Sequence, residues 1–197
     1  MGAQFEEEFV SVAQFWEMEA ASDVRHEYLN GRVYAMAGGT PNHSKIIFAF
    51  STAIGVRLRG NPCSGSNSDQ LVKIARSGLR TYPDILVSCP PEEYDEEEPN
   101  ALLNPVLIVE VLSPSTQNYD RTEKWEHYRR IPALRDYILV SSERVRVEHL
   151  HRNERGEWIL WTGIELDSVL RAPELGLEIP LDEIYEGLDL PSGLTRM

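Results

Sequence analysis

The sequence predicts a mixed α/β fold in which a central β-sheet is flanked by helices. Stretches with helical spacing of apolar residues alternate along the chain with short apolar runs of strand length. The run at 106–112 is almost continuously apolar and β-branched, which is the pattern of a strand covered on both faces. An amphipathic stretch at 121–131 separates this strand from another at 136–141. We therefore expect a helical crossover that joins two parallel neighbours.

The first sixty residues predict a helix, a hairpin and a second helix. Residues 8–20 carry apolar side chains near helical spacing. Asn30-Gly31 stands between two short apolar runs, and this dipeptide is the strongest short signal for a β-hairpin turn. The second helix should begin after Thr40, which can act as its N-cap, and should end at Gly60.

The rest of the chain is predicted to be mainly strands. Each is a short apolar run bounded by turn residues, and the runs lie at 71–75, 82–89, 136–141, 144–152 and 157–163. Ser77-Gly78 predicts a turn between the first two runs. The tail at 177–188 should contain one short strand and a helical turn.

Composition indicates one globular domain over residues 1–197. Hydrophobic residues are 42% and charged residues 26% of the chain, a balance typical of folded soluble proteins. No stretch approaches the run of about 20 apolar residues that crosses a bilayer, and the acidic N-terminus lacks the pattern of a secretion signal. Two cysteines, Cys63 and Cys89, have no zinc-binding spacing and suit a reducing compartment. We therefore expect a cytoplasmic protein.

The net charge of −13 argues against one class of function. Proteins that hold DNA by neutralising phosphates usually present a basic face. A net charge is a sum, however, so it lowers the expectation of nucleic-acid binding without excluding a local basic surface. Residues 92–100 contribute six of the acidic side chains, and we interpret this stretch as a solvated surface loop.

Two carboxylates stand inside apolar runs that otherwise have the pattern of buried strands. Asp84 follows Pro83 at the start of one run, and Glu110 lies between Val109 and Val111 in the other. Burial of an unpaired carboxylate is costly, so Glu110 must be protonated, paired with a cation or bound to a metal. Alternatively, Asp84 is a turn former and Glu110 belongs to a structural ion pair.

Two neighbouring carboxylates repel each other and favour a hard divalent cation. Oxygen ligands select Mg²⁺ or Mn²⁺ over zinc. Such a cation can activate water and stabilise the charge that develops on a phosphate during attack. A nearby lysine would complete this chemistry.

These residues resemble the PD-(D/E)xK nuclease motif, a proline-aspartate on one strand and a glutamate two residues before a lysine on the next. Pro83-Asp84 and Glu110 match this motif, but Leu112 occupies the lysine position. Three longer segments, RHEYLNGRVYAMAGG, YPDILVSC and NPVLIVEVLSPSTQNYDRTEKWEHYRRIP, closely resemble the Uma2 family, also known as DUF820, of restriction-endonuclease-like proteins. The similarity runs from about residue 10 to residue 150, and its EVLSPST…D…K…Y block is specific.

The resemblance implies a restriction-endonuclease-like fold and a Mg²⁺- or Mn²⁺-dependent endonuclease that hydrolyses DNA phosphodiester bonds. It further implies that Asp84, Glu110 and Lys124 are catalytic, and that Glu27, Asp84 and Glu110 hold the metal ion. Glu27 matches the family's glutamate before the hairpin. Taken without the family, Glu27 is more readily a surface charge.

Lys124 is the residue expected to replace the missing lysine, because a basic residue of the following helix can reach the same place. Helical spacing puts Arg121, Lys124 and Tyr128 on one face. The other interpretation of Lys124 is a solvated helix lysine.

The histidines rank lower as site residues. His43, at a helix start, is interpreted as a capping or packing residue, or else as a substrate contact. His127, His149 and His151 have no companions at metal-ligand spacing.

We expect a homodimer that acts on DNA, because cutting both strands of a duplex commonly uses two active sites, and we expect no membrane partner. The alternative function is a catalytically idle module on the same fold that binds nucleic acid or protein. Leu112 and the net charge favour this alternative, whereas the retained acids and Lys124 oppose it.

Overall fold

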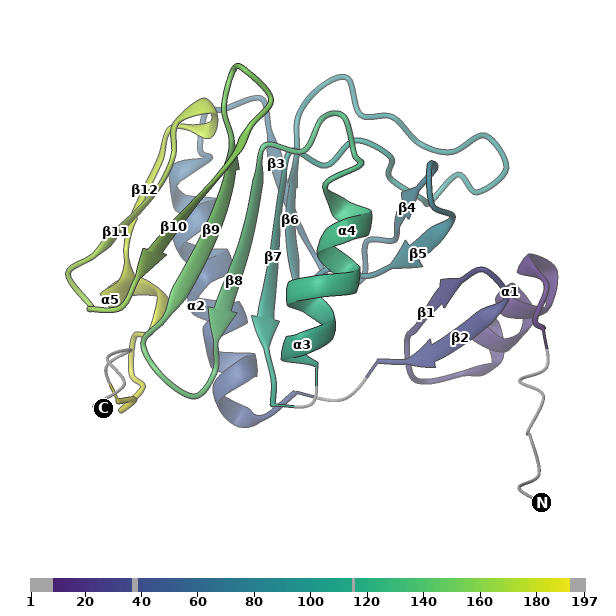
Figure 1. The fold of residues 1–197 in the computed structure, drawn as a ribbon, viewed down its shortest axis with the longest axis horizontal. Coiled ribbons are helices and arrows are strands. Elements are labelled where there is room, and N and C mark those ends of the chain that lie inside the picture. Colours follow the sequence, from purple (N-terminus) through teal and green to yellow (C-terminus); the bar gives the residue numbers. More distant parts are fainter. Residues whose placement is uncertain (1–8, 37–38, 115, 192–197) are drawn as a thin grey trace.

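Six strands form the central sheet of the computed structural model, which describes residues 9–36, 39–114 and 116–191 (Figure 1). Their order across the sheet is β10-β9-β8-β7-β6-β3, and the strands are β3 (Ser64–Asn67), β6 (Ile85–Ser88), β7 (Leu107–Leu112), β8 (Asp136–Ser141), β9 (Val147–Arg152) and β10 (Trp158–Gly163). β7 and β8 are parallel, and the other neighbouring pairs of this sheet are antiparallel. The predicted crossover and the mixed α/β fold class are confirmed.

A smaller sheet lies beside the central one, with the order β2-β1-β5-β4 (Figure 1). Its strands are β1 (His26–Leu29), β2 (Arg32–Ala35), β4 (Val72–Ile74) and β5 (Leu79–Thr81). β5 leads through residues 82–84 directly into β6, so the chain passes from the small sheet into the central sheet at this point. A separate antiparallel pair is formed by β11 (Val169–Ala172) and β12 (Leu177–Pro180).

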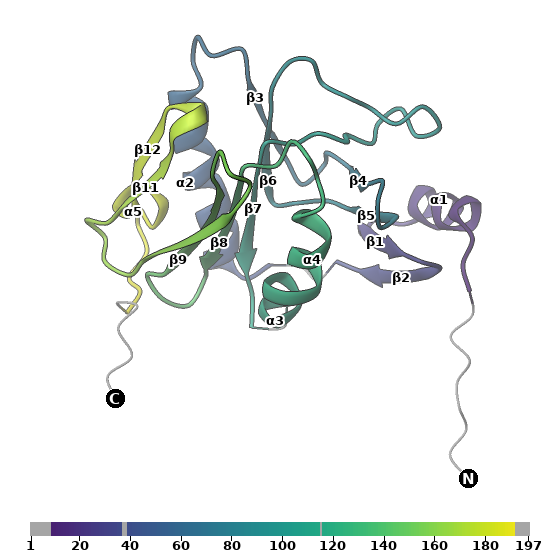
Figure 2. The same cartoon turned by 45° about the horizontal axis from the view of Figure 1, so that its top comes forward.

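Helices cover both faces of the central sheet (Figure 2). α2 (Pro41–Arg57) lies on one face, and a continuous helical stretch of α3 (Gln117–Tyr119), the π-helical η1 (Asp120–Lys124) and α4 (Trp125–Tyr128) lies on the other. The other described helices are α1 (Val12–Ala21), η2 (Pro173–Leu175) and α5 (Leu181–Ile184). Within the described ranges, every helix lacks the combination of length and apolar character that crossing a membrane requires.

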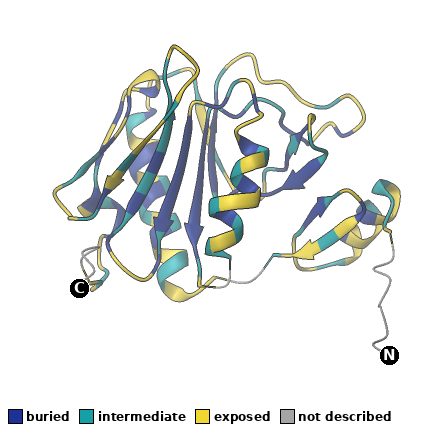
Figure 3. Ribbon diagram, in the orientation of Figure 1, coloured by how far each residue is buried: buried dark blue, intermediate teal, exposed yellow. Residues whose placement is uncertain are grey.

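Side-chain alternation along β7 explains why both faces of the sheet need a helix. Val109 and Val111 belong to the core that contains the buried residues of α2, whereas Ile108 and Leu112 pack in a second core with Tyr128 of α4. All of β7 is buried (Figure 3). The prediction of a strand covered on both faces is therefore confirmed.

Two local signals act as the sequence predicts. The Thr40 hydroxyl accepts a hydrogen bond from the backbone N–H of His43 at 3.2 Å and caps α2. Asn30 and Gly31 have φ values of 48° and 85°, the positive angles that a two-residue hairpin turn requires. α2 ends shortly before the expected Gly60.

The strand prediction is wrong at four places. β5 is absent from the predicted strands, because its three residues lie between the runs predicted at 71–75 and 82–89. β3 is a mostly exposed, polar edge strand without an apolar pattern. The run 82–89 enters the ladder only from Ile85, because the chain bends after β5. β11 is absent from the predicted strands, since its four residues carry no turn-bounded apolar run of their own.

Most of the acidic stretch 92–100 is exposed, as expected of a surface loop, but Asp95 and Glu98 are held by basic side chains. Arg80 Nε of β5 donates to Glu98 Oε2 at 2.8 Å, and both side chains are buried. Lys73 Nζ of β4 lies 2.7 Å from Asp95 Oδ2. Basic side chains of the small sheet therefore hold this stretch against the fold.

Cys63 and Cys89 form a disulfide. They flank the paired strands β3 and β6, whose register places Ser64 opposite Ser88, so the two cysteines meet at the end of the ladder. Disulfides are typical of oxidising compartments. The pairing therefore departs from the expectation that the cysteines suit a reducing one.

Candidate active site

Five charged side chains converge where the small sheet meets the central sheet. They are Glu27 of β1, Asp84 just before β6, Glu110 of β7, and Asp120 and Lys124 of η1. We call these five residues the acidic cluster, because four of them are carboxylates and one is a lysine. Elements that are distant in sequence build it, and the four residues predicted from the sequence are all members.

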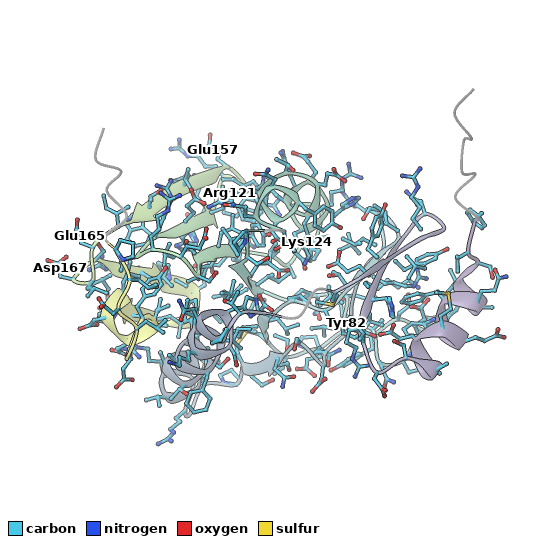
Figure 4. All side chains as sticks on the ribbon, turned by 90° about the horizontal axis from the view of Figure 1, so that it is seen from below. Tyr82, Arg121, Lys124, Glu157, Glu165 and Asp167 are labelled. Carbon is cyan, nitrogen blue, oxygen red and sulfur yellow. A yellow bond between two sulfur atoms is a disulfide. The ribbon has the colours of Figure 1, made fainter. Side chains whose placement is uncertain are left out.

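Lys124 is the centre of the acidic cluster and is only 4% exposed. Its Nζ lies 2.8 Å from Glu27 Oε1, 3.0 Å from Glu110 Oε1 and 3.6 Å from Asp120 Oδ1. Figure 4 shows Lys124 in the interior of the molecule, away from its edges. The interpretation of Lys124 as a solvated helix lysine is therefore excluded.

Asp84 is fixed against β7 by a backbone hydrogen bond. The N–H of Val111 donates to Asp84 Oδ2 at 2.7 Å. The antiparallel register of β6 and β7 pairs Ile85 with Val109, so Asp84 comes next to Glu110 at this end of the ladder. The two carboxylates thus belong to adjacent strands.

Hydroxyl groups support the two glutamates. The phenol of Tyr128 donates to Glu110 Oε1 at 2.7 Å from the buried face of α4. The hydroxyl of Thr81, on β5, donates to Glu27 Oε1 at 2.6 Å. These donors fix the orientation of both carboxylates in the interior.

Asp84 and His43 form the open edge of the acidic cluster. Their side chains are 13% and 17% exposed, and His43 Nε2 lies 3.4 Å from Asp84 Oδ2. Burial alone would lower the pKa of His43, but the hydrogen bond to Asp84, the charges of Asp84 and Asp120 and the backbone of Val111 together outweigh burial and raise that pKa. The ring of His43 therefore faces the cluster rather than capping α2.

One lysine cannot neutralise four carboxylates, and the pKa values reflect this. Burial raises the pKa of Glu110 to about 8, with the charges of Asp84 and Asp120 acting in the same direction and Lys124 opposing. Burial also raises the pKa of Asp120. For Glu27, burial is outweighed by Lys124 and by hydrogen bonds, so its pKa is lowered. Lys124 therefore interacts with both Glu110 and Glu27, and its charge does not offset the effect of burial on the pKa of Glu110.

The donor set fits a hard divalent cation. Glu27, Asp84, Glu110 and Asp120 offer only carboxylate oxygens, which suit Mg²⁺ or Mn²⁺ rather than a softer metal. A cation between Asp84 and Glu110 would stabilise the charged form of Glu110, which burial and the charges of Asp84 and Asp120 disfavour. These two residues are therefore the best placed metal ligands.

Asp120 is the cluster member that sequence reasoning missed. It lies four residues before Lys124 and is 4% exposed. The available signal was this spacing, but acidic and basic residues one turn apart usually form a solvated pair on a helix surface. The π-helical turn of η1 instead buries both residues, and such turns are frequent at functional sites.

The predicted common face of Arg121, Lys124 and Tyr128 is only partly correct. Arg121 Nε donates to Glu148 Oε2 of β9 at 2.9 Å, outside the acidic cluster. Figure 4 shows Arg121 and Lys124 close together on one helical segment. A π-helical turn has more residues per turn than an α-helix, so the three-and-four spacing does not hold across η1.

A surface hollow among the described residues lies away from the acidic cluster. It has a volume of about 700 Å³ and is lined by residues of α2 and β3 and by Ile85, on the α2 side of the sheet. None of the four carboxylates lines it. Asp84 and His43 are more exposed than Glu27, Glu110, Asp120 and Lys124.

Metal-free protein should lose stability as the pH rises toward 8. The pKa of Glu110 is about 8 in the folded protein against an ordinary value of 4.5, so the folded state holds more protons in this interval. The contribution of Glu110 protonation to the free energy of unfolding is complete below pH 4.5 and is lost as pH rises through about 8. Between these values the free energy of unfolding falls with a limiting slope of about 1.4 kcal/mol per pH unit. Denaturant unfolding in EDTA across this interval measures the slope. An equal pH dependence of the free energy of unfolding in the wild type and in Glu110→Gln would contradict the prediction.

A mixed sheet flanked by helices, with carboxylates from adjacent strands beside a helix lysine, defines a restriction-endonuclease-like protein. A crystal structure described as "a putative nuclease belonging to DUF820", from Anabaena variabilis, has this fold, with a TM-score of 0.68 over 83% of this chain and 91% of that chain. The two sequences are 16% identical, so this likeness shows the fold alone.

The chain belongs to the Uma2 family, described as "Putative restriction endonuclease", whose model matches residues 12–182. Two related proteins of Synechocystis sp., slr1290 and sll1609, are both described as uncharacterized. The first is 37% identical over 179 residues, covering 91% of this chain and 93% of its own length. The second is 29% identical over 151 residues, covering 77% and 85%. The family recognised in the sequence is confirmed.

Proposed function

We propose that this protein is a divalent-metal-dependent endonuclease that hydrolyses DNA phosphodiester bonds. The observation that carries the proposal is the convergence of Asp84, Glu110 and Lys124 from two adjacent strands and the following helix. Membership of the family described as "Putative restriction endonuclease" supports the same reaction class.

Asp84 and Glu110 would hold the cation, with Glu27 assisting. A bound Mg²⁺ would supply Lewis-acid stabilisation of the charge that develops on the phosphate. The Val111 N–H and the Tyr128 hydroxyl keep the two carboxylates oriented in advance, which lowers the cost of reorganisation during the reaction.

Lys124 would stabilise negative charge during hydrolysis. A water oxygen attacks phosphorus and releases a proton to solvent, the bond between phosphorus and the leaving sugar oxygen breaks, and the sugar oxygen takes up a proton from solvent. The ammonium group lies 3.0 Å from Glu110 Oε1, beside the proposed metal ligands. His43, at the open edge, would contact the DNA backbone, and a homodimer would present two such sites to a duplex.

One observation favours the second candidate, an idle interaction module on the same fold. Lys124 already pairs with three carboxylates, and its side chain is 5% exposed. A lysine that permanently neutralises the cluster would be a structural counter-ion. The two functions differ in whether the cluster takes up a divalent cation.

Mg²⁺ should raise the melting temperature of the wild-type protein. An ion that binds only the folded state adds about 2.7 kcal/mol at a concentration of 100 times its Kd, and each kcal/mol corresponds to about 2–4 °C for a chain of this length. Thermal melting during titration with Mg²⁺ or Mn²⁺ measures this shift. Asp84→Asn should abolish it, whereas Asp69→Asn, which changes an aspartate with a 76% exposed side chain, should retain it. A wild-type protein that shows no shift would support the idle module.

A further inference from the structure

A second polar cluster is built from β8 and β9. Asp136 opens β8, and His149 and His151 stand two residues apart on β9, so their side chains share one face of the strand. Asp136 is the direct register partner of His151. His149 Nε2 lies 2.7 Å and His151 Nδ1 lies 2.8 Å from Asp136 Oδ1. We call these three residues the histidine cluster.

The histidine cluster lies on the opposite face of the central sheet from the acidic cluster. Val147, on the same face of β9 as His149, packs in the core that contains α2. Leu150, on the other face, packs against the core that contains Tyr128, the residue that donates to Glu110. The sheet therefore separates the two clusters, and they can bind different ligands.

Asp136 is a buried carboxylate that lacks a hydrogen-bond partner for one oxygen and a lysine or arginine to neutralise its charge, among the described residues. It is 0% exposed, and its Oδ2 has no hydrogen-bond partner among the described residues. Its ion pairs in the described part of the chain are with the two histidines, without a lysine or an arginine. A cation beside this carboxylate would supply both the missing partner and the compensating charge.

The donor atoms select a different metal from the acidic cluster. One atom from each residue lies within 4.8 Å of the other two, close enough for one ion after small adjustments. Two imidazole nitrogens with one carboxylate oxygen suit Zn²⁺ and related transition metals, whereas Mg²⁺ prefers oxygen ligands alone. Three protein ligands also leave a coordination position open.

Glu174 of η2 stands behind one of these ligands. Its Oε1 lies 3.8 Å from His151 Nε2, the ring nitrogen that does not contact Asp136. A carboxylate behind a ligating histidine fixes the ring orientation and strengthens the ligand. The His151 side chain is 24% exposed, which provides a route for the ion from this side.

We propose that Asp136, His149 and His151 bind Zn²⁺ or a closely related transition-metal ion, with Glu174 as a positioning residue for His151. The ion would tie β8 to β9 beside η2. This inference is independent of the nuclease proposal, because it uses other residues on the other face of the sheet. It also corrects the expectation that His149 and His151 lack companions, since Asp136 is their companion.

Calorimetric titration of untagged, EDTA-treated full-length protein with Zn²⁺ tests the proposal. We expect one ion per chain, and Co²⁺ in its place should develop visible absorption that reports nitrogen ligation. His151→Ala should weaken Zn²⁺ binding by about 10²-fold or more, and Glu174→Gln by about 10-fold. His127→Ala, which removes a histidine outside the cluster, and Glu110→Gln, which alters the acidic cluster, should both bind as the wild type does.

Several outcomes would overturn the site. One is the absence of stoichiometric Zn²⁺ uptake by the wild-type protein. Another is unchanged uptake by the double variant His149→Ala/His151→Ala, which would identify an adventitious ion only. Loss of Zn²⁺ binding in Glu110→Gln would show that the ion binds at the acidic cluster instead. Substitution of the wholly buried Asp136 can prevent folding. His151 is partly exposed, so His151→Ala should fold and keeps the test conclusive.

Discussion

Glu110→Gln should abolish metal-dependent cleavage of DNA while leaving the fold intact. Glutamine has nearly the same shape as glutamate and can still accept the hydrogen bond from Tyr128, but it cannot contribute negative charge to a cation. We expect activity to fall by about 10³-fold or more, beyond the loss of a single electrostatic stabiliser. Plasmid cleavage, measured as a function of protein concentration, gives the ratio of wild-type to variant activity.

The stability of Glu110→Gln separates catalysis from folding. In EDTA above about pH 8 the variant should be at least as stable as the wild type, because it carries no buried charge beside Asp84 and Asp120. Glu123→Gln, an exposed change in the same helical stretch, should keep both activity and stability. A Glu110→Gln protein that cleaves DNA like the wild type would remove Glu110 from the mechanism.

Lys124→Met should strongly destabilise the metal-free protein. The change keeps a long apolar stem but removes the cation shared by Glu27, Glu110 and Asp120. Loss of one partner from a buried ion-pair network typically costs about 3–5 kcal/mol, because the remaining charges are left uncompensated. Chemical denaturation in EDTA measures this loss. Lys45→Met, an exposed change on α2, should have little effect.

Added Mg²⁺ should recover part of the stability lost in Lys124→Met, since a divalent cation replaces the missing positive charge. Cleavage should nevertheless remain lower by about 10²-fold or more. The double variant Leu112→Lys/Lys124→Ala returns a lysine to the position two residues after Glu110, on the same face of β7. Partial recovery of activity would support a displaced lysine. Full activity in Lys124→Ala alone would show that Lys124 takes no part in the reaction.

Elements that are determined by adjacent residues could be predicted from the sequence. The Thr40 cap and the Asn30-Gly31 turn each depend on only a few residues, and the apolar run of β7 reports burial on both faces directly. β3 could not be predicted, because its polar residues become a strand only by pairing with β6.

The residues of the candidate site also differ in how far the sequence alone could predict them. Asp84 and Glu110 stand out because a carboxylate in an apolar run is costly to bury. Glu27 and Lys124 were reached through the resemblance to a family. Asp120 required the π-helical turn, whose register no spacing rule reveals.

The histidine cluster could not be predicted from the sequence, because Asp136 belongs to a different strand from His149 and His151. Asp136 lies 13 and 15 residues before His149 and His151. Only the pairing of β8 with β9 sets the register that brings them together.

Incubation of the wild-type protein with supercoiled, linear and single-stranded DNA, in Mg²⁺, in Mn²⁺ and in EDTA, tests the nuclease proposal most directly. We expect cleavage of at least one of these DNA forms with either metal, none in EDTA, and none in any condition with Glu110→Gln purified in parallel. Intact DNA in every metal condition, from a protein whose melting temperature responds to the same metal, would contradict the proposed reaction.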